Sequence, residues 1–220
     1  MLMAQPPGAV LFDLDGTLVD SAPDLARAAN RVLADHGRPP VAYERLRQVV
    51  SKGGRAMLAV SFPDFSDAER EPLLPVFLRY YGEALAVDSL LFDGVDELLA
   101  ALDARGIRWG IVTNKPEGLA RGVVEGFGWR QRCAVLVGGD TLPTRKPDPA
   151  PLFHACDRLG IEAATALYVG DDLRDVQAAR AAGMPCVAAL WGYREDGDDP
   201  HRWQADHVAA RATDVLALLP

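Results

Sequence analysis

The chain has 220 residues, which is enough for one sizeable hydrophobic core or for a core with a smaller inserted segment. Apolar residues make up 49% of the chain and charged residues 25%, a globular balance that excludes a disordered protein. The formal net charge of −8 argues against non-specific binding to nucleic acid or to an anionic membrane surface.

The cysteines and the N-terminal segment predict the cellular compartment of the protein. Cys133, Cys156 and Cys186 are scattered and form no C-x-x-C pair, so neither a disulfide framework nor a zinc site is expected. No basic stretch precedes an apolar one at the N-terminus, and no apolar run approaches about 18 residues. We therefore expect a cytoplasmic protein without a signal peptide or a membrane span.

Five short runs rich in branched side chains predict buried strands. In chain order they cover residues 9–12, 107–113, 134–137, 166–169 and 185–190. The segments between the last four have helical spacing and end in glycine, which is a helix-stop signal. Alternating strands and helices predict a Rossmann-like α/β fold, in which a parallel sheet is sandwiched by helices.

The alternation is interrupted after the first strand by about seventy residues with helical patterns only. We interpret residues 21–88 as a small inserted α-helical domain, and residues 1–20 with 89–220 as the core domain. The helices expected in the insertion cover residues 22–37, 43–51, 55–62 and 67–86. Pro63 separates the last two, and Pro72 and Pro75 fall inside the last pattern, where they leave its start open.

The first strand ends in two aspartates that share one face. Successive strand residues point to opposite sides, so Asp13 and Asp15 lie about 6.6 Å apart on the same side. Gly16 follows them directly. Two neighbouring carboxylates repel each other, and a cation or a shared proton is needed to offset that cost.

Polar residues also follow the other predicted strands. Thr113 and Asn114 follow the second, Lys146 lies in the connection after the third, and Asp171, Asp172 and Asp175 follow the fourth. The carboxyl ends of parallel strands meet at one edge, where ligands bind. Carboxylate oxygens that leave room for water suit Mg²⁺, while a hydroxyl and a lysine suit a phosphoryl group.

These groups fit phosphoryl transfer through a covalent intermediate. Asp13 is placed to attack phosphorus, since an aspartate can act as a nucleophile and form an aspartyl-phosphate. Asp15 can protonate the leaving alcohol and then activate a water molecule that hydrolyses the intermediate.

The segments DLDGTLVD, VTN, RKPDP and VGDDLRD resemble, in order, the four motifs of the haloacid-dehalogenase-like hydrolase superfamily. The resemblance covers the core, and the insertion resembles the small helical cap of that superfamily. It implies that Asp13 is nucleophile and Mg²⁺ ligand and that Asp15 is acid and base, with its backbone carbonyl on the metal. It further implies that Thr113 and Lys146 hold the phosphoryl group, and that Asp171 and Asp175 complete the metal site. Asp172 stands at a variable position, and its role stays open between a helix cap and support of the metal shell.

Within the superfamily the chain is similar to phosphoglycolate phosphatases, including a branch with N-acetylmuramic acid 6-phosphate phosphatases. This resemblance implies a small phosphorylated metabolite as substrate. The turn SKGGR is the predicted contact to its leaving group, because glycines allow close backbone approach. Lys52, Gly53, Gly54 and Arg55 are its candidate residues, and the two cations suit the carboxylate that both leaving groups carry.

Three alternatives stay open at this point. The natural ester can belong to either phosphatase type. The same intermediate can pass its phosphoryl group to a second hydroxyl, as in a sugar phosphomutase. A binding module that kept the fold without turnover is a further possibility. The chain is expected to act as a monomer or a homodimer.

Overall fold

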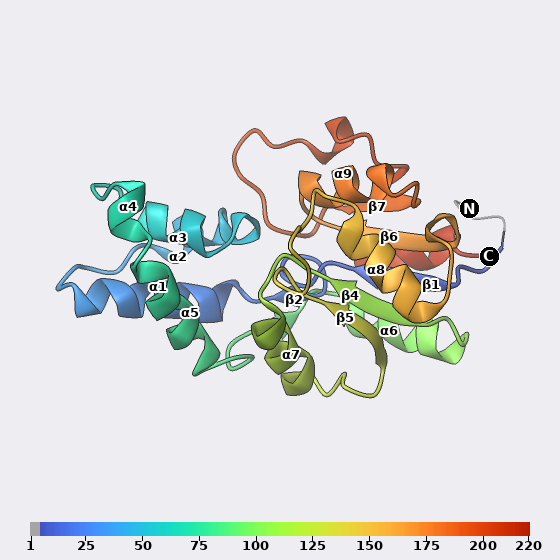
Figure 1. The fold of residues 1–220 in the computed structure, drawn as a ribbon, viewed down its shortest axis with the longest axis horizontal. Coiled ribbons are helices and arrows are strands. Elements are labelled where there is room, and N and C mark those ends of the chain that lie inside the picture. Colours follow the sequence, from blue (N-terminus) through green and yellow to red (C-terminus); the bar gives the residue numbers. More distant parts are fainter. Residues whose placement is uncertain (1–4) are drawn as a thin grey trace.

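The computed structural model describes residues 5–220, which form two lobes connected by a narrow junction (Figure 1). The larger lobe contains a six-stranded parallel sheet in the order β5-β4-β1-β6-β7-β8. Its strands are β1 (Ala9–Phe12), β4 (Trp109–Val112), β5 (Cys133–Val137), β6 (Ala166–Gly170), β7 (Cys186–Ala189) and β8 (His207–Ala209). The predicted Rossmann-like α/β class is confirmed.

The central strand β1 lies between β4 and β6, with Phe12 opposite Ile111 and Val169. All four residues of β1, β4 and β7 are buried, as expected for strands covered on both faces. The chain extends the sheet from β1 first toward β5 and later toward β8. The site at the carboxyl end of β1 therefore lies where the strand order reverses, a position that binds ligands in such sheets.

Helices cover both faces of the sheet (Figure 1). One hydrophobic cluster joins the sheet to α6 (Val95–Ala104), α7 (Glu117–Gly126) and the 3₁₀ helix η4 (Ala212–Leu218). A second cluster, on the other face, joins it to α8 (Ala150–Leu159) and α9 (Leu173–Ala181). These layers fix the starts of α7 and α9 at the same edge of the sheet.

The smaller lobe, which we call the helical lobe, contains five α-helices around a hydrophobic cluster of its own. They are α1 (Ala22–Asp35), α2 (Tyr43–Arg47), α3 (Gly54–Ser61), α4 (Asp67–Arg70) and α5 (Leu73–Gly82), and the 3₁₀ helix η1 (Val50–Lys52) precedes α3. Tyr193, from the segment after β7, also packs into this cluster. One residue of the sheet lobe thus belongs to the core of the helical lobe.

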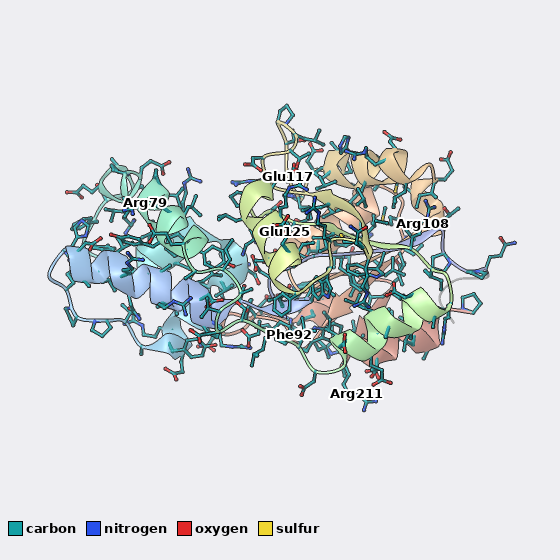
Figure 2. All side chains as sticks on the ribbon, turned by 90° about the horizontal axis from the view of Figure 1, so that it is seen from below. Arg79, Phe92, Arg108, Glu117, Glu125 and Arg211 are labelled. Atoms are coloured by element: carbon teal, nitrogen blue, oxygen red, sulfur yellow. The ribbon has the colours of Figure 1, made fainter. Side chains whose placement is uncertain are left out.

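A two-stranded antiparallel ribbon joins the lobes where the chain leaves the sheet and returns to it. It consists of β2 (Val19–Asp20) and β3 (Leu90–Leu91). Figure 2 places Phe92, directly after β3, at the junction between the lobes. The sequence analysis predicted neither this ribbon nor β8, and it expected one helix where the chain forms α4 and α5. Among the described residues no helix is both long and apolar enough to cross a membrane, and the three cysteines are free.

Candidate active site

Three carboxylates converge at the carboxyl edge of the sheet. Asp13 follows β1, Asp171 follows β6, and Asp175 lies in the first turn of α9. Each offers an oxygen, and these oxygens lie within 4.8 Å of one another. The structure thus brings together aspartates that lie up to 162 residues apart in the chain.

Two glycines make this approach possible. A Cβ atom on Gly16 would lie 2.1 Å from Asp171, and one on Gly170 would lie 2.3 Å from Asp175. Gly16 also has a φ of +89°, in the region that other residues rarely adopt. The sequence places glycine where a side chain would displace a carboxylate of the cluster.

Lys146 is the buried cation of the cluster. Its Nζ lies 3.1 Å from Asp13 Oδ1 and 2.7 Å from Asp175 Oδ1, and it donates to the Val112 carbonyl at 2.9 Å and to the Tyr168 hydroxyl at 2.8 Å. Burial alone would lower the pKa of Lys146, but Asp13 and Asp175 outweigh it and raise the pKa. The lysine therefore stays charged beside the predicted nucleophile.

One lysine does not balance three buried carboxylates. Burial, together with repulsion from Asp13 and Asp175, raises the pKa of Asp171 well above its usual value. Burial also raises the pKa of Asp175, to about 6, although Lys146 opposes the change. A buried, all-oxygen donor set that lacks positive charge fits a hard divalent cation such as Mg²⁺.

The carboxylate of Asp15 is not a member of this cluster and is held by two other side chains. The Ser21 hydroxyl donates to Asp15 Oδ1 at 2.6 Å, and Lys115 Nζ donates to both carboxylate oxygens at 2.9 Å. Lys115 is buried and also donates to the hydroxyl of Tyr81, from α5, at 2.7 Å. Burial would lower the pKa of Lys115, but Asp15 and Tyr81 outweigh it and raise the pKa.

Thr113 and Asn114 lie beside the cluster at the end of β4. Thr113 is buried, and its Oγ1 accepts a hydrogen bond from the Lys115 backbone N–H at 3.3 Å. Asn114 Nδ2 donates to the Lys146 carbonyl at 2.9 Å, which ties the two loops together. Asn114 Oδ1 is buried and has no hydrogen-bond partner within residues 5–220. Both residues line the cavity described below.

Asp172 is the N-cap of α9 and a contact to the helical lobe. Its Oδ1 accepts from the Arg174 backbone N–H at 2.9 Å, and its Oδ2 lies 3.1 Å from Lys52 Nζ. Although burial opposes it, these contacts with Arg174 and Lys52 lower the pKa of Asp172 to about 2. Nearby, the Ser51 hydroxyl donates to Asp171 Oδ2 at 2.9 Å. The turn before α3 is thus seated directly on the acidic cluster.

A cavity of about 210 Å³ lies between the lobes and opens onto these residues. Its polar wall comes from the strand ends, and apolar residues of the helical lobe, among them Met57 and Phe77, form the opposite wall. Besides Asp171, every candidate site residue lines it, namely Asp13, Asp15, Lys52, Gly53, Gly54, Arg55, Thr113, Asn114, Lys146 and Asp175.

The cations of the cavity differ in whether they are paired. The guanidinium of Arg55 makes two hydrogen bonds to the Glu71 carboxylate, at 2.6 and 3.0 Å. Lys52 is paired with Asp172. Arg145 also lines the cavity, is exposed, and makes no side-chain hydrogen bond or ion pair with residues 5–220.

The sequence analysis missed Lys115, Tyr81 and Arg145. One signal was available for the first of them. The chain contains only three lysines among 23 basic residues, and all three line this cavity. No comparable signal marks Tyr81, which has a helical spacing shared with its apolar neighbours.

The carboxyl edge of the parallel sheet holds a buried lysine beside carboxylates that suit a metal ion. This arrangement defines an enzyme of the phosphotransfer and hydrolysis class. The family model of haloacid dehalogenase-like hydrolases matches residues 10–189. The chain belongs to this family, and within it to the phosphatases.

Curated relatives carry two names. A phosphoglycolate phosphatase of Xanthomonas campestris is 58% identical over 200 residues, which are 91% of this chain and 90% of the relative. An N-acetylmuramic acid 6-phosphate phosphatase of Pseudomonas aeruginosa is 44% identical over 212 residues, 96% of this chain and 94% of the relative. The crystal structure of a predicted phosphoglycolate phosphatase from Haemophilus somnus is 30% identical, with a TM-score of 0.87 over 98% of this chain and 99% of that one.

Proposed function

We propose that this phosphatase is a Mg²⁺-dependent phosphomonoester hydrolase that acts through an aspartyl-phosphate on a small phosphorylated metabolite. The observation that carries the proposal is the convergence of Asp13, Asp171 and Asp175 beside Lys146 at the wall of a cavity. Asp13 and Asp175 line the cavity, and Asp171 is buried beside them.

In the first step, an oxygen of Asp13 bonds to phosphorus and the bond from phosphorus to the leaving alcohol breaks. Asp15 gives its proton to the leaving oxygen. In the second step, water bonds to phosphorus and gives a proton to Asp15, and the bond from phosphorus to Asp13 breaks. Inorganic phosphate leaves, and both aspartates return to their starting forms.

The surrounding residues bind and orient the reacting groups. The Thr113 hydroxyl and Lys146 face the charge of the phosphoryl group. The carboxylates of Asp13 and Asp171 and the backbone carbonyl of Asp15 would hold Mg²⁺, with Asp175 supporting its water ligands. Bound Mg²⁺ supplies positive charge that lets an anionic substrate approach an anionic nucleophile.

The helical lobe, residues 21–88, acts in this proposal as a cap that covers the site of the core formed by 1–20 and 89–220. Contacts from Ser51 and Lys52 to Asp171 and Asp172 support this role. The cap residues that line the cavity select the leaving group.

The compartment in this proposal is the reducing cytoplasm, which the three free cysteines support.

We propose a phosphoglycolate phosphatase type of specificity. The high identity to the Xanthomonas relative supports it. An N-acetylmuramic acid 6-phosphate phosphatase is the second candidate, because the apolar wall with Met57 and Phe77 suits the methyl groups of that larger leaving group. Both leaving groups carry a carboxylate, which an unpaired cation at the cavity would recognise.

The test begins with phosphate release from 4-nitrophenyl phosphate by the purified protein, first with Mg²⁺ and then with EDTA. We expect turnover only with Mg²⁺, and a loss of about 10³-fold or more in Asp13→Asn, because an amide does not attack phosphorus. Asp148→Asn, in an exposed loop near the site, is the matched control and should keep its rate. Substantial turnover by Asp13→Asn would contradict the assignment of the nucleophile.

A substrate panel then separates the candidates. It contains phosphoglycolate, N-acetylmuramic acid 6-phosphate and hexose phosphates, and kcat/KM is measured for each. Release of inorganic phosphate identifies a hydrolase, whereas phosphate that stays on the sugar in a new position would identify a mutase. A protein that binds these esters and turns over none of them would be a binding module.

A further inference from the structure

Lys115 is a buried cation that the reaction scheme above does not use. Two of its donor contacts go to the two oxygens of Asp15, and the third goes to the hydroxyl of Tyr81. An ammonium group has three N–H donors, so all of them are occupied. All three donors of Lys115 are therefore directed at Asp15 and Tyr81, and the proposed reaction scheme places the phosphoryl group beside Lys146 instead.

The backbone of Lys115 is fixed to the sheet lobe. Its N–H donates to Thr113 Oγ1 at 3.3 Å, and its carbonyl accepts from the Gly139 N–H at 2.8 Å. These contacts tie it to the ends of β4 and β5. The backbone of Lys115 is thus held in place, and its side chain reaches Asp15 in the turn that follows β1.

The third partner of Lys115 comes from the other lobe. Tyr81 lies near the end of α5 and is buried in the helical cluster, with an exposure of 1%. Lys115 Nζ lies 4.2 Å from the centre of its ring as well as 2.7 Å from its hydroxyl. The contact therefore exists only when the helical lobe is seated on the sheet lobe.

We propose that Lys115 is a positioning residue for Asp15, and that Tyr81 makes this positioning depend on the seated helical lobe. The proposal rests on the proposed function, since it assigns a task to Lys115 within that reaction. An ammonium that contacts both oxygens fixes the plane of the carboxylate as well as its position. Ser21 holds the same carboxylate from another side, so Asp15 is oriented by both the core and the insertion.

The geometry assigns this task to the second step. Both oxygens of Asp15 accept from the same ammonium, so Lys115 fixes the plane in which this carboxylate meets the attacking water of the second step. Release of 4-nitrophenolate needs no proton, so the first step with that ester does not depend on Asp15.

Lys115→Met tests the positioning role by rapid mixing with 4-nitrophenyl phosphate. We expect a burst of about one equivalent of 4-nitrophenolate per enzyme, followed by steady-state turnover reduced about 10²-fold. The burst reports formation of the aspartyl-phosphate, and the slow phase reports its hydrolysis. A burst rate that falls in proportion to the steady rate, or a steady rate that does not change, would overturn the proposal.

Tyr81→Phe tests the link to the helical lobe, because it keeps the ring and removes only the hydroxyl. We expect the same pattern with a smaller loss, about 10-fold in the steady rate. Tyr80→Phe is the matched control: the neighbouring tyrosine bonds to Asp35 on the outside of the lobe, and its loss should leave both phases unchanged. Equal effects of the two tyrosine variants would overturn the link.

A second measurement does not depend on turnover. Because the chain has only three lysines, ¹⁵N-lysine labelling gives few ammonium signals to assign. Asp15→Asn and Tyr81→Phe should each shift the Lys115 signal and leave that of Lys52 in place, and an unmoved Lys115 signal would overturn the proposal. If the unaltered protein shows no Mg²⁺-dependent turnover, the proposed function fails, whereas the spectra still decide whether Lys115 binds Asp15 and Tyr81.

Discussion

Individual cations of the cavity differ in what they are free to bind. Lys52 and Arg55 were predicted to meet the carboxylate of the leaving group, and both line the cavity. In the structure they are paired with Asp172 and Glu71. Arg145, directly before Lys146, is the cavity-lining arginine whose side chain has no partner within residues 5–220. A carboxylate that pairs with Arg145 displaces no existing ion pair.

Arg145→Gln should therefore change substrate preference more than Arg55→Gln does. We expect KM for phosphoglycolate to rise about 10- to 100-fold, because the variant loses a hydrogen bond to a charged group, which contributes about 1.5–3 kcal/mol to binding. KM for 4-nitrophenyl phosphate, which lacks the carboxylate, should change much less. Parallel steady-state kinetics with both esters give the ratio, and Arg55→Gln is the control. If Arg55→Gln alters the ratio and Arg145→Gln does not, the carboxylate binds at the SKGGR turn instead.

The sequence predicted the acidic residues of the site but not the pairing of its cations. Asp13 and Asp171 were found because the ends of parallel strands share one edge, a rule that needs no coordinates. The partners of Lys115 and Arg55 depend on how helices of the insertion are rotated and packed. Tyr81 lies 34 residues from Lys115, and Glu71 lies 16 residues from Arg55, with no pattern that links either pair.

At the scale of elements, the first turn of α1 anchors the segment that returns from the helical lobe. The buried carboxylate of Asp24 accepts hydrogen bonds from three consecutive backbone N–H groups, those of Val87, Asp88 and Ser89, at 3.0, 2.9 and 3.2 Å. Burial alone would raise the pKa of Asp24, but the bonds from Ser89 and Asp88 outweigh it and lower the pKa below its usual 3.8.

Asp24→Asn should lower the free energy of unfolding by about 2 kcal/mol at pH 7, since an amide accepts fewer of these bonds. The sign of its pH dependence follows from the lowered pKa: the unfolded chain binds the proton first, so the contribution is complete above about pH 4 and is lost as the pH falls below it. Urea unfolding at a series of pH values measures the difference between the two proteins. Asp67→Asn, at a fully exposed side chain of α4, is the control. A difference that stays constant down to pH 3 would contradict the role of the carboxylate.

The sequence predicted elements well where they are long and buried, and poorly where they are short. The strands of the central sheet are uninterrupted apolar runs, because helices cover both faces. β8 has three residues and begins with an exposed histidine, and each strand of the β2–β3 ribbon has two, too few for a period to be recognised. Pro72 lies in the break between α4 and α5, directly before α5 begins, and Ser66 with Glu69 forms a capping box at the start of α4.

At the scale of the whole molecule, we expect the acidic cluster to link metal binding to stability. Asp13 and Asp171 follow two strands of the sheet, Asp175 lies in α9, and Asp171 also accepts from Ser51 of the helical lobe. Unfolding separates these residues, so only the folded chain offers the three carboxylates together. A cation that binds there stabilises the folded state by mass action.

We therefore expect Mg²⁺ to raise the melting temperature in a concentration-dependent way. At a hundred times the Kd the stabilisation is about 2.7 kcal/mol, a rise of roughly 5 to 10 °C for a chain of this size. Asp171→Asn should remove most of this rise, because it takes a charged ligand from the buried cluster, whereas Asp148→Asn should keep it. Thermal unfolding followed by circular dichroism at increasing Mg²⁺, with EDTA as the zero point, makes the measurement without any substrate. An equal rise in the unaltered protein and in Asp171→Asn would mean that Mg²⁺ binds elsewhere, and the reaction scheme would lose its metal site even if phosphatase activity were found.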